Sequence, residues 1–580
     1  MRGEAKIPLE NVVETDVLVI GGGIAGCFAA IKAKEAGVDV TIVDKAYAGK
    51  SGSSIAAGGW WMVFNPEWGH DFDASMEDVT INGEYLNNHD WDEIILKESW
   101  AAYQDLVAWG VEFPVPASRV KDYCDTHLTG QRTARAPSLP WGTVPLRHRK
   151  TSPVLREQAE KVGIRIVDRI MVTDLLKQDG KVVGAVGFSY DTGDLHIFKA
   201  KATVASGGNN CFRSPGFHTA CLTGDAEAMA YRAGAEITGK EFPDTHFNLA
   251  TYPAWKSNAE LYAAYMYFTD AESKRISGTV GFDLFMEFAV HAGRGPVIWD
   301  PDSATPGDVE AMREYVRKRA NPVEAERIGL DYTRGGKYPC IGGSAAGVSS
   351  QQTSGVWVVG KKCATSLPGL YAAGDCCGAR VCGASHRGPG FGVTGAAVTG
   401  KRAGLGAAEY ALQAEKPVIN EEELARLKKL MYAPAERRSG FSPRWVTQLL
   451  QNTMIPYFIL YIKHGERLQA ALTIVEFLRD HLVPKLIARD AHELRLTHET
   501  ANMILNAEMI LRASLFRTES RGLHYREDYP RRDDPSWLAW VKVKEEQGRM
   551  TILKEPVPKE WWPDLSKPYK ERYPERFPGE

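Results

Sequence analysis

The chain has 580 residues, which at roughly 150 residues per domain suggests two to four domains with a large core. Lys and Arg number 70 against 73 Asp and Glu, so the formal charge is -3 and we expect no nucleic acid partner, because nothing steers the protein toward a polyanion. Residues 1–16 contain several charges and no apolar segment, so they do not resemble a secretory signal peptide. The longest apolar run, residues 454–462, is too short to span a bilayer. We therefore expect a globular, cytoplasmic protein without a transmembrane segment.

Nine cysteines, an odd number without a repeated C-x-x-C spacing, favour reduced thiols over a disulfide framework. Cys376, Cys377 and Cys382 lie close together in the sequence, but a metal or iron–sulfur site would need a fourth ligand and a recognisable spacing. We interpret them as loop and core thiols and expect no bound metal.

Residues 15–45 carry the strongest functional signal. The β-branched run Val17–Ile20 predicts a buried parallel strand, a helical stretch follows, and a second strand ends at Asp44. The glycines between strand and helix have the spacing G-x-G-x-x-G and are Gly21, Gly23 and Gly26. They allow a tight turn, a close pyrophosphate and close helix packing, and an acid at the second strand can accept hydrogen bonds from an adenosine ribose. The glycine motif alone is weak evidence, but the whole unit in register predicts a dinucleotide site.

The segment AGKSGSSIAAGGW, residues 48–60, continues directly into apolar residues, which favours a cofactor-lining loop over a flexible linker. Helical spacing predicts helices over residues 90–110, 224–234, 300–320 and near 394–408. Strands are predicted over residues 164–167, 180–188 and 195–199, as a meander with a turn at 191–193, and again over 202–209 and 369–375. Residues 114–153 and 241–296 have weak periodicity, and residues after about 420 are predicted to be mostly helical and charged.

Several motifs together resemble the flavoprotein subunits of succinate dehydrogenase and fumarate reductase, a superfamily that includes L-aspartate oxidase and the alpha subunit of adenylylsulfate reductase. Besides the glycine turn, they are ASGGN (205–209), TGDAEAMAYRAGA (223–235), SGVWVVGKKCATSLPGLYAAGD (354–375) and TESRGLHYREDYPRRDD (518–534). The resemblance implies an α/β fold: a Rossmann-like FAD-binding domain with an inserted α+β capping domain and a C-terminal helical domain. The expected boundaries are 1–238 and 331–412 for the FAD-binding domain, 239–330 for the cap, and 413–580 for the helical domain and tail.

The resemblance also implies FAD as the cofactor. Ser53 stands where members with covalent flavin carry a histidine, so we expect noncovalent FAD. The expected FAD-binding residues are Gly21, Gly23, Ile24, Ala25, Gly26, Asp44, Lys45, Ser51, Gly52, Ser53, Ser54, Ala57, Gly58, Gly59, Val172, Ser206, Gly207, Thr223, Asp225, Gly374, Asp375, Gly390, Gly392 and Val393.

Only some of the catalytic residues of the dicarboxylate enzymes have counterparts in this chain. His246 matches the histidine of their His-Pro-Thr motif but lacks the Pro and Thr, and Lys337 replaces the histidine of their H-Y-T-M-G-G segment. We find no counterpart to the proton-donating arginine of their G-E-R-F segment. His386 replaces the arginine of their N-R-L-G-G segment, in a stretch more similar to the S-H-K of adenylylsulfate reductase.

An anionic substrate favours a guanidinium beside a group that titrates near neutrality. His386 and Arg387 provide this pair, and we expect them to act with His246 and with Arg275 of the cap. The alternatives are that Arg387 neutralises an FAD phosphate or caps a helix, that His246 is a core histidine, and that Arg275 is a surface residue. A further set, interpreted as packing and ion-pair groups of the helical domain, is Arg521, His524 and Arg526.

We therefore expect an FAD-dependent oxidoreductase that exchanges hydride with a small, anionic organic substrate and passes electrons to or from a separate partner, such as a ferredoxin-like iron–sulfur subunit. The alternative is an adenylylsulfate-reductase-like or flavin electron-transfer subunit of a multisubunit complex, with a vestigial substrate pocket. An NAD-dependent dehydrogenase would use the same glycine motif but leaves residues 51–59 and 369–375 unexplained.

Overall fold

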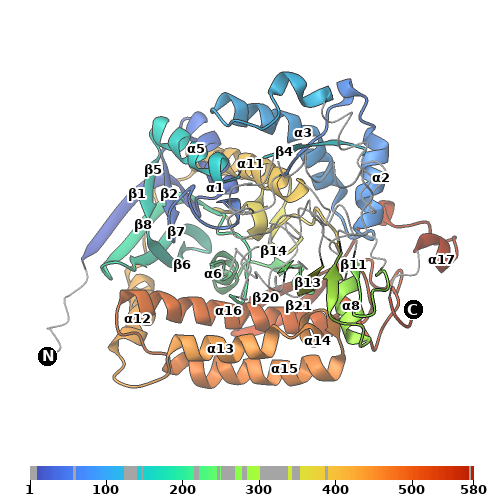
Figure 1. Cartoon of the computed structure of the whole chain (residues 1–580). Coiled ribbons are helices and arrows are strands. Elements are labelled where there is room, and N and C mark those ends of the chain that lie inside the picture. Colours follow the sequence, from blue (N-terminus) through green and yellow to red (C-terminus); the bar gives the residue numbers. More distant parts are fainter. Residues whose placement is uncertain are drawn as a thin grey trace.

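The structure is a computed structural model. It describes residues 9–55, 60–122, 140–146, 148–213, 221–244, 248–249, 268–276, 284–300, 337–341, 353–385, 390–573 and 577–580. Within these residues a large mixed sheet has α1 and α11 on one side, and a layer of C-terminal helices lies along the other (Figure 1). The predicted α/β fold class is confirmed.

The parallel part of the large sheet positions the glycine turn. Its strands, in spatial order, are β5 (Arg165–Asp168), β2 (Val40–Asp44), β1 (Glu10–Ile20), β8 (Leu195–Ala205) and β16 (Leu370–Ala372). Every neighbouring pair in this series is parallel, so the carboxyl ends of all five strands meet at one edge. Helices α1 (Ile24–Glu35) and α11 (Phe391–Gln413) pack together over this part of the sheet.

The strands around β8 differ from the predicted meander. The predicted strands over 195–199 and 202–209 are one strand, because β8 pairs with β1 from Glu10↔Leu195 to Ile20↔Ala205 without a break. The meander consists of β6 (Ile170–Gln178), which the sequence analysis missed, β7 (Lys181–Ser189) and the first half of β8. The predicted strand over 164–167 is β5, which joins β2 in the parallel sheet instead.

The next described helices along the chain are α2 (Phe72–Asn82), α3 (His89–Ala108), α5 (His148–Lys161) and α6 (Asp225–Ala233). Of these, α3 and α6 follow the predicted periodicity, whereas α2 and α5 were not predicted. The sequence analysis missed α5, because its first turns fall within the polar stretch 114–153 and Pro153 lies inside the helix. The predicted charged helix over 300–320 lies outside the described residues.

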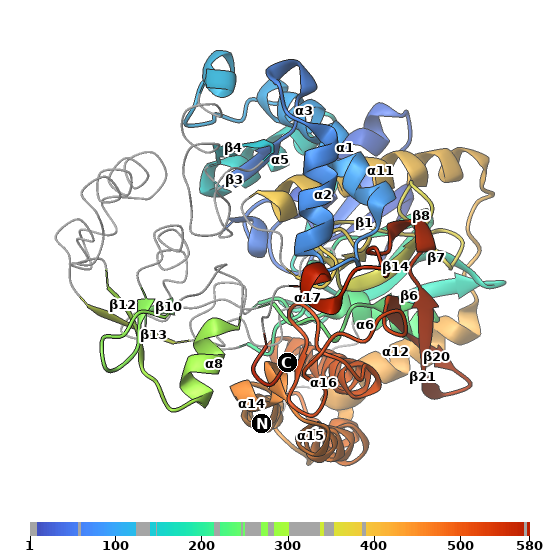
Figure 2. The same cartoon turned by 90° about the vertical axis from the view of Figure 1, so that its right-hand side faces the viewer.

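A second, smaller sheet is antiparallel. Its strands, in spatial order, are β10 (Asn248–Leu249), β13 (Tyr338–Ile341), β12 (Val297–Trp299) and β11 (Phe268–Thr269). Figure 2 shows this sheet and α8 (Phe285–His291) to one side of the large sheet. The small sheet thus takes in residues on both sides of residue 330. A separate ladder pairs β3 (Trp60–Val63) with β4 (Gly142–Pro145).

The C-terminal region is a helical layer followed by a β-hairpin. The helices before the hairpin are α12 (Glu421–Glu436), α13 (Pro443–Met454), α14 (Tyr457–Leu460), α15 (Gly465–Phe477) and α16 (Ala491–Phe516), and the short α17 (Tyr569–Arg572) follows the hairpin. The hairpin of β20 (Ala539–Glu546) and β21 (Arg549–Pro556) was not predicted. It extends the large sheet through β9 (Ile237–Thr238), because β20 pairs with β9 and β9 pairs with β14 (Gly355–Val359). The remaining short strands are β15 (Ala364–Thr365), β17 (Cys377–Gly378), β18 (Ile462–Lys463) and β19 (Tyr525–Arg526).

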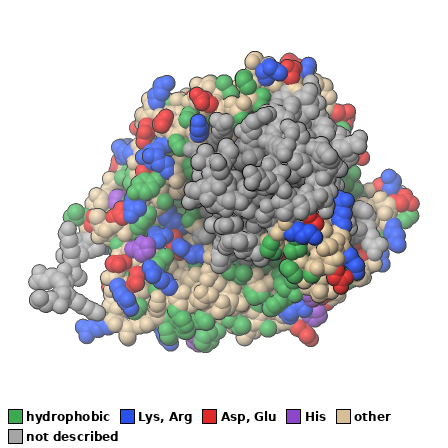
Figure 3. Space-filling view, viewed as in Figure 1, with side chains coloured by type: hydrophobic (Ala, Val, Ile, Leu, Met, Phe, Trp, Pro, Cys, Tyr) green, Lys and Arg blue, Asp and Glu red, His purple; other side chains and the backbone are tan. Residues whose placement is uncertain are grey.

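The outer face of the helical layer is partly apolar. Hydrophobic side chains gather along the lower edge in Figure 3, over α13 and α15. Exposed members on these helices are Trp445, Ile474 and Phe477. In the part of the chain that the structure describes, no helix has the length and hydropathy needed to cross a bilayer. The cysteines described are all free thiols, and all but Cys221 are buried.

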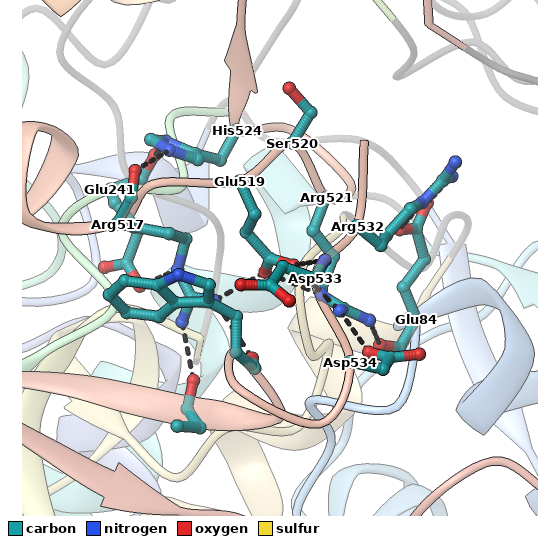
Figure 4. Close-up of polar contacts among 12 residues, drawn as sticks. Glu84, Glu241, Arg517, Glu519, Ser520, Arg521, His524, Arg532, Asp533 and Asp534 are labelled. Carbon is teal, nitrogen blue, oxygen red and sulfur yellow. Dashed lines mark hydrogen bonds and ion pairs between the residues drawn. The ribbon is translucent and has the colours of Figure 1, made fainter. Parts of the chain in front are cut away.

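Buried arginines anchor the segment that follows α16 (Figure 4). Nε of Arg521 lies 2.8 Å from Glu519, and its Nη2 lies 2.6 Å from Asp534. Arg532 binds both carboxylate oxygens of Glu84 at 2.9 Å, which joins this segment to the turn after α2. The side chains of Arg521 and Arg532 are almost fully buried, so their positive charges are balanced by the paired carboxylates rather than by water.

Two further residues of this segment are also buried. His524 Nδ1 forms a hydrogen bond with Nζ of Lys463 at 2.9 Å, and Arg526 donates to Asp528 and to the Ser514 carbonyl. Their partners come from α16 and from the strand β18, so the segment is fixed against the helical layer.

Candidate functional site

A cavity opens at the carboxyl edge of the parallel strands. Its walls come from the glycine turn, the ends of β2 and β8, the loop around Ser53, the first turns of α6, and the segment Gly374–Asp375. This is the edge at which ligands bind in open parallel sheets.

The glycine turn brings the start of α1 onto β1. Gly21 has φ +104°, and a Cβ atom there would lie 2.5 Å from the Ser206 carbonyl oxygen. A Cβ atom on Gly26 would lie 1.9 Å from the Gly21 carbonyl, so only glycine permits this close approach of helix and strand.

The first turn of α1 presents its backbone to the cavity. Gly23 has no side chain with which to cap the helix, and Gly23, Ile24 and Ala25 line the cavity. N of Ile24 donates to Oγ of Ser54 at 3.0 Å, so a hydroxyl from the neighbouring loop already accepts from this turn. A helix N-terminus with backbone donors beside a serine hydroxyl is an arrangement suited to phosphate.

The carboxylate of Asp44 lines the cavity and also accepts hydrogen bonds from the protein backbone. Oδ2 accepts a hydrogen bond from N of Gly22 at 2.8 Å, and Oδ1 accepts from N of Ala46 at 2.7 Å and from Oγ of Ser51 at 3.3 Å. Burial raises the pKa of Asp44, and the two backbone hydrogen bonds oppose that rise. A carboxylate offers about four lone-pair directions, so three protein donors leave room for one more.

Lys45 is turned toward the protein rather than the cavity space. Its Nζ lies 2.7 Å from Asp225 Oδ2, 2.8 Å from Glu499 and 2.9 Å from Thr223 Oγ1. It also lies 3.1 Å from the Cys221 carbonyl oxygen. Burial lowers the pKa of Lys45, but Asp225 and Glu499 outweigh burial and raise it above the ordinary value. The three donors of the ammonium group are therefore used within the protein.

The cavity gathers most of the described residues that the sequence predicts to bind a cofactor. Those that line it are Gly21, Gly23, Ile24, Ala25, Asp44, Lys45, Ser51, Gly52, Ser53, Ser54, Val172, Ser206, Gly207, Asp225, Gly374 and Asp375. Gly26 and Thr223 support lining residues, and the α11 group Gly390, Gly392 and Val393 is not part of the lining. Ala57, Gly58 and Gly59 lie outside the described residues.

Several apolar lining residues were not selected from the sequence, because an apolar side chain gives no chemical signal for a ligand contact. They are Met171, Leu222, Ala226, Met229 and Ala396. They come from β6, α6, α11 and the loop before α6, so only the tertiary fold brings them together.

The predicted catalytic residues are largely outside the described part of the chain. His246, His386 and Arg387 all lie outside the described residues, and their expected roles stay predictions. Arg275 is described: it is exposed, forms a backbone bridge with Thr269 beside β11, and is not in the cavity lining.

Arg380 is a buried cation that the sequence analysis did not select. Its Nη1 donates to the Thr353 carbonyl at 2.8 Å, while Nε and Nη2 have no hydrogen-bond partner among the residues that the structure describes. Burial lowers the pKa of Arg380 to about 10. Its backbone φ of +63° is also unusual for a residue with a side chain. The only sequence signal was a lone arginine in a stretch of small residues, six positions before His386.

Comparison with known proteins gives two family matches. An FAD binding domain matches residues 16–261, and a fumarate reductase flavoprotein C-terminal domain matches residues 447–573. The first match contains the whole cavity lining except Gly374, Asp375 and Ala396.

Similar proteins align over nearly the full chain. One subunit of the fumarate reductase (CoM/CoB) of Methanothermobacter marburgensis is 27% identical, with 91% of this chain and 96% of the relative covered. The fumarate reductase flavoprotein subunit of Mycobacterium tuberculosis is 28% identical, with 96% and 99% covered. The solved adenylylsulfate reductase of Archaeoglobus fulgidus has a TM-score of 0.77 at 21% identity, with 95% and 97% covered, which indicates a shared fold.

Proposed function

Because the chain belongs to the superfamily of FAD-dependent fumarate reductase and succinate dehydrogenase flavoproteins, we propose that it exchanges hydride between FAD and a small anionic organic substrate. It is an oxidoreductase that uses FAD and passes electrons to or from a separate partner. When bound, FAD supplies the two-electron chemistry, and the protein supplies orientation, charge and a route for protons.

The cavity is the observation that carries this proposal. The glycine turn and the first turn of α1 lie in its wall, an arrangement suited to the pyrophosphate of a dinucleotide. Asp44 retains one acceptor direction for a ribose hydroxyl, and the segment Gly374–Asp375 closes the lining from another strand end. We assign the α1 turn to the pyrophosphate and the Asp44 side to the adenosine.

The flavin is proposed to be noncovalent. Ser53 lies in the cavity wall, in a short 3₁₀ turn over Ser53–Ile55, and a serine cannot form the histidyl bond of the covalent members. Acid precipitation of the purified protein should leave the yellow colour in the supernatant. Flavin that remains with the pellet would contradict this assignment.

The substrate is proposed to be an anion bound by cations on the segment after β17. In this proposal Arg387 provides a guanidinium, His386 provides a titrating imidazole, and His246 acts with them. Arg380 is a buried cation in this region whose Nε and Nη2 have no hydrogen-bond partner among the described residues. The charge of Glu241 stabilises it, and a bound anion would add a second stabilising charge.

The electron partner is proposed to be a ferredoxin-like iron–sulfur subunit. The relatives from Methanothermobacter and Mycobacterium are both named as subunits, which supports a complex of this kind. An adenylylsulfate-reductase-like activity is the second candidate, and the Ser385-His386-Arg387 stretch favours it.

One experiment separates these activities. The purified flavoprotein is mixed anaerobically with dicarboxylates, 2-hydroxy acids, thiols and sulfite in turn, and bleaching of the flavin absorbance is followed. Bleaching by an organic acid supports the proposed function. Bleaching by sulfite that requires added AMP supports the second candidate, because adenylylsulfate forms from both compounds and sulfite alone can bleach a flavin by adding to it without electron transfer. Oxidation of chemically reduced protein by unsaturated acids tests the reverse direction. A flavin that exchanges electrons with none of these compounds would contradict both substrate proposals.

A further inference from the structure

One face of helix α16 contacts the wall of the cofactor cavity. Glu499, Asn502 and Asn506 follow the spacing i, i+3, i+7 and so share that face. Glu499 lies 2.8 Å from Nζ of Lys45, and Nδ2 of Asn502 donates to Asp225 Oδ1 at 2.8 Å. Nδ2 of Asn506 donates to the carbonyl of Gly224, the N-cap residue of α6, at 3.2 Å.

Lys45 and Asp225 form the part of the wall that this face holds. Both residues line the cavity, and their side chains are 24% and 16% exposed. Asp225 accepts from Lys45, Asn502 and Thr223 at once, so three of its about four lone-pair directions are used inside the protein. The wall is thus held from behind by α16.

Glu499 is the charge on which this arrangement depends. Its side chain is 1% exposed and forms ion pairs with Lys45, Arg213 and Arg495. Burial raises the pKa of Glu499, but the three cations outweigh burial and lower it, so the carboxylate is charged at neutral pH. Without that charge, Lys45 would keep only Asp225 as a close anion among the described residues, and α16 would lose its ionic contact with the wall.

We propose that Glu499 is a positioning residue for the cofactor: it holds Lys45 against Asp225, and it thereby couples the docking of α16 to FAD binding. The proposal rests on the assignment of the cavity to FAD. Coupling of this kind is reciprocal, so FAD must stabilise the docked α16 by the same factor by which α16 strengthens FAD binding.

The test compares two glutamates of the same helix. Glu508 is 2% exposed and pairs with Arg479 and Arg512, and its offset of nine residues places it on the opposite face from Glu499. Glu499→Gln and Glu508→Gln each remove one buried charge with two or more cationic partners. FAD dissociation constants are measured by flavin fluorescence on deflavinated protein, and unfolding midpoints are measured alongside.

We expect Glu499→Gln to weaken FAD binding by about 5- to 150-fold. Glu508→Gln should lower the unfolding midpoint but leave the FAD dissociation constant within about twofold. Equal effects of the two variants on FAD binding, or no effect of Glu499→Gln, would overturn the proposal. Asp44→Ala is measured in the same series. If Asp44→Ala weakens FAD binding and Glu499→Gln does not, only the proposed coupling is wrong. If neither variant weakens FAD binding, the assignment of the cavity to FAD is wrong as well.

A second measurement needs no variant. Amide hydrogen exchange of the wild-type protein is compared with and without FAD. Slower exchange in α16 around residues 495–506 with FAD bound supports the coupling. Protection confined to the cavity loops, with unchanged exchange in α16, would contradict it.

Discussion

Oδ2 of Asp44 lies 2.8 Å from the backbone nitrogen of Gly22, so the acid at the end of β2 holds the glycine turn at the end of β1. The two strands are parallel neighbours, and this hydrogen bond fixes the distance between the turn and the second strand end. Asp44 therefore shapes the glycine turn, and we propose that it also accepts a hydrogen bond from a hydroxyl of the ligand.

The first prediction follows from this contact. Asp44→Ala should weaken FAD binding by about tenfold or more, because hydrogen bonds to a charged group contribute about 1.5–3 kcal/mol each. Asp44→Asn should not restore binding, since its amide would place a donor against one of the two backbone donors. The measurement is the FAD-to-protein ratio after gel filtration, with circular dichroism to show that the fold is kept.

Asp168 is the matched control for Asp44. It lies opposite Asp44 on β5, accepts from N of Ala48 at 2.9 Å and pairs with Arg156, but does not line the cavity. Asp168→Ala should keep FAD. Equal flavin loss in both variants would show that Asp44 acts only on the fold.

The part of the site encoded by local sequence could be predicted from the sequence. The glycine spacing and the strand that ends in Asp44 lie within one βαβ unit, and the structure places both at the cavity. The helix α6 was found for the same reason, because its periodicity is local.

Contacts between distant segments could not be predicted in this way. The pairing of β20 with β9 joins residues Lys542 and Thr238, and nothing in either segment names its partner. Lys45 is the clearest case at the site: its position in the motif suggested a ligand contact, yet Glu499 and Asp225 engage it. A charged side chain is directed by whichever counter-charges the tertiary fold brings near, which the sequence does not reveal.

The second prediction concerns acid stability. His89 stacks on Trp561 with ring centroids 4.8 Å apart, and burial lowers the pKa of His89 to about 4 from an ordinary value of 6.5. Burial also lowers the pKa of His498 and His524. The unfolded chain therefore binds protons as the pH falls below about 6.5, before the folded protein does, and stability present above that pH is lost as the pH falls toward about 4.

We expect the unfolding midpoint to fall as the pH is lowered from about 6.5 to about 4. His89→Phe keeps the aromatic contact with Trp561 but cannot be protonated, so it should reduce that fall. The check is thermal unfolding in buffers across this range. A variant with the same pH dependence as the wild type would show that His89 does not contribute.

The third prediction concerns the buried arginines after α16. Arg521→Met should destabilise the protein by up to about 3–5 kcal/mol, because it removes one of the two cations that pair with each of the buried carboxylates of Glu519 and Asp534, whose remaining cations are Arg517 and Arg572. Arg426→Met is the control, since its ion pair with Glu423 is largely exposed and should contribute about 0–1 kcal/mol. Denaturant unfolding of the FAD-loaded protein measures both. Similar losses in the two variants would show that the network in Figure 4 is not a main anchor.

The last prediction concerns chemistry at His386 and Arg387. If they bind and protonate the substrate, His386→Ala and Arg387→Ala should retain FAD but slow flavin reduction by about 10² to 10⁴. A residue that only neutralises an FAD phosphate would instead lower flavin content and leave the rate per bound flavin unchanged. Flavin occupancy and stopped-flow reduction on the same samples separate the two roles.

A variant of the neighbouring Arg380 helps to distinguish substrate binding from proton donation. Its guanidinium is fully buried, so Arg380→Lys keeps a positive charge there but loses the fork that holds a carboxylate through two hydrogen bonds. If the substrate anion sits near this segment, the lysine variant should raise KM more than it lowers kcat, whereas His386→Ala should mainly lower kcat because it removes the proton donor. Normal turnover in all three variants would place the catalytic groups elsewhere, with the cap around residues 240–300 as the next segment to test.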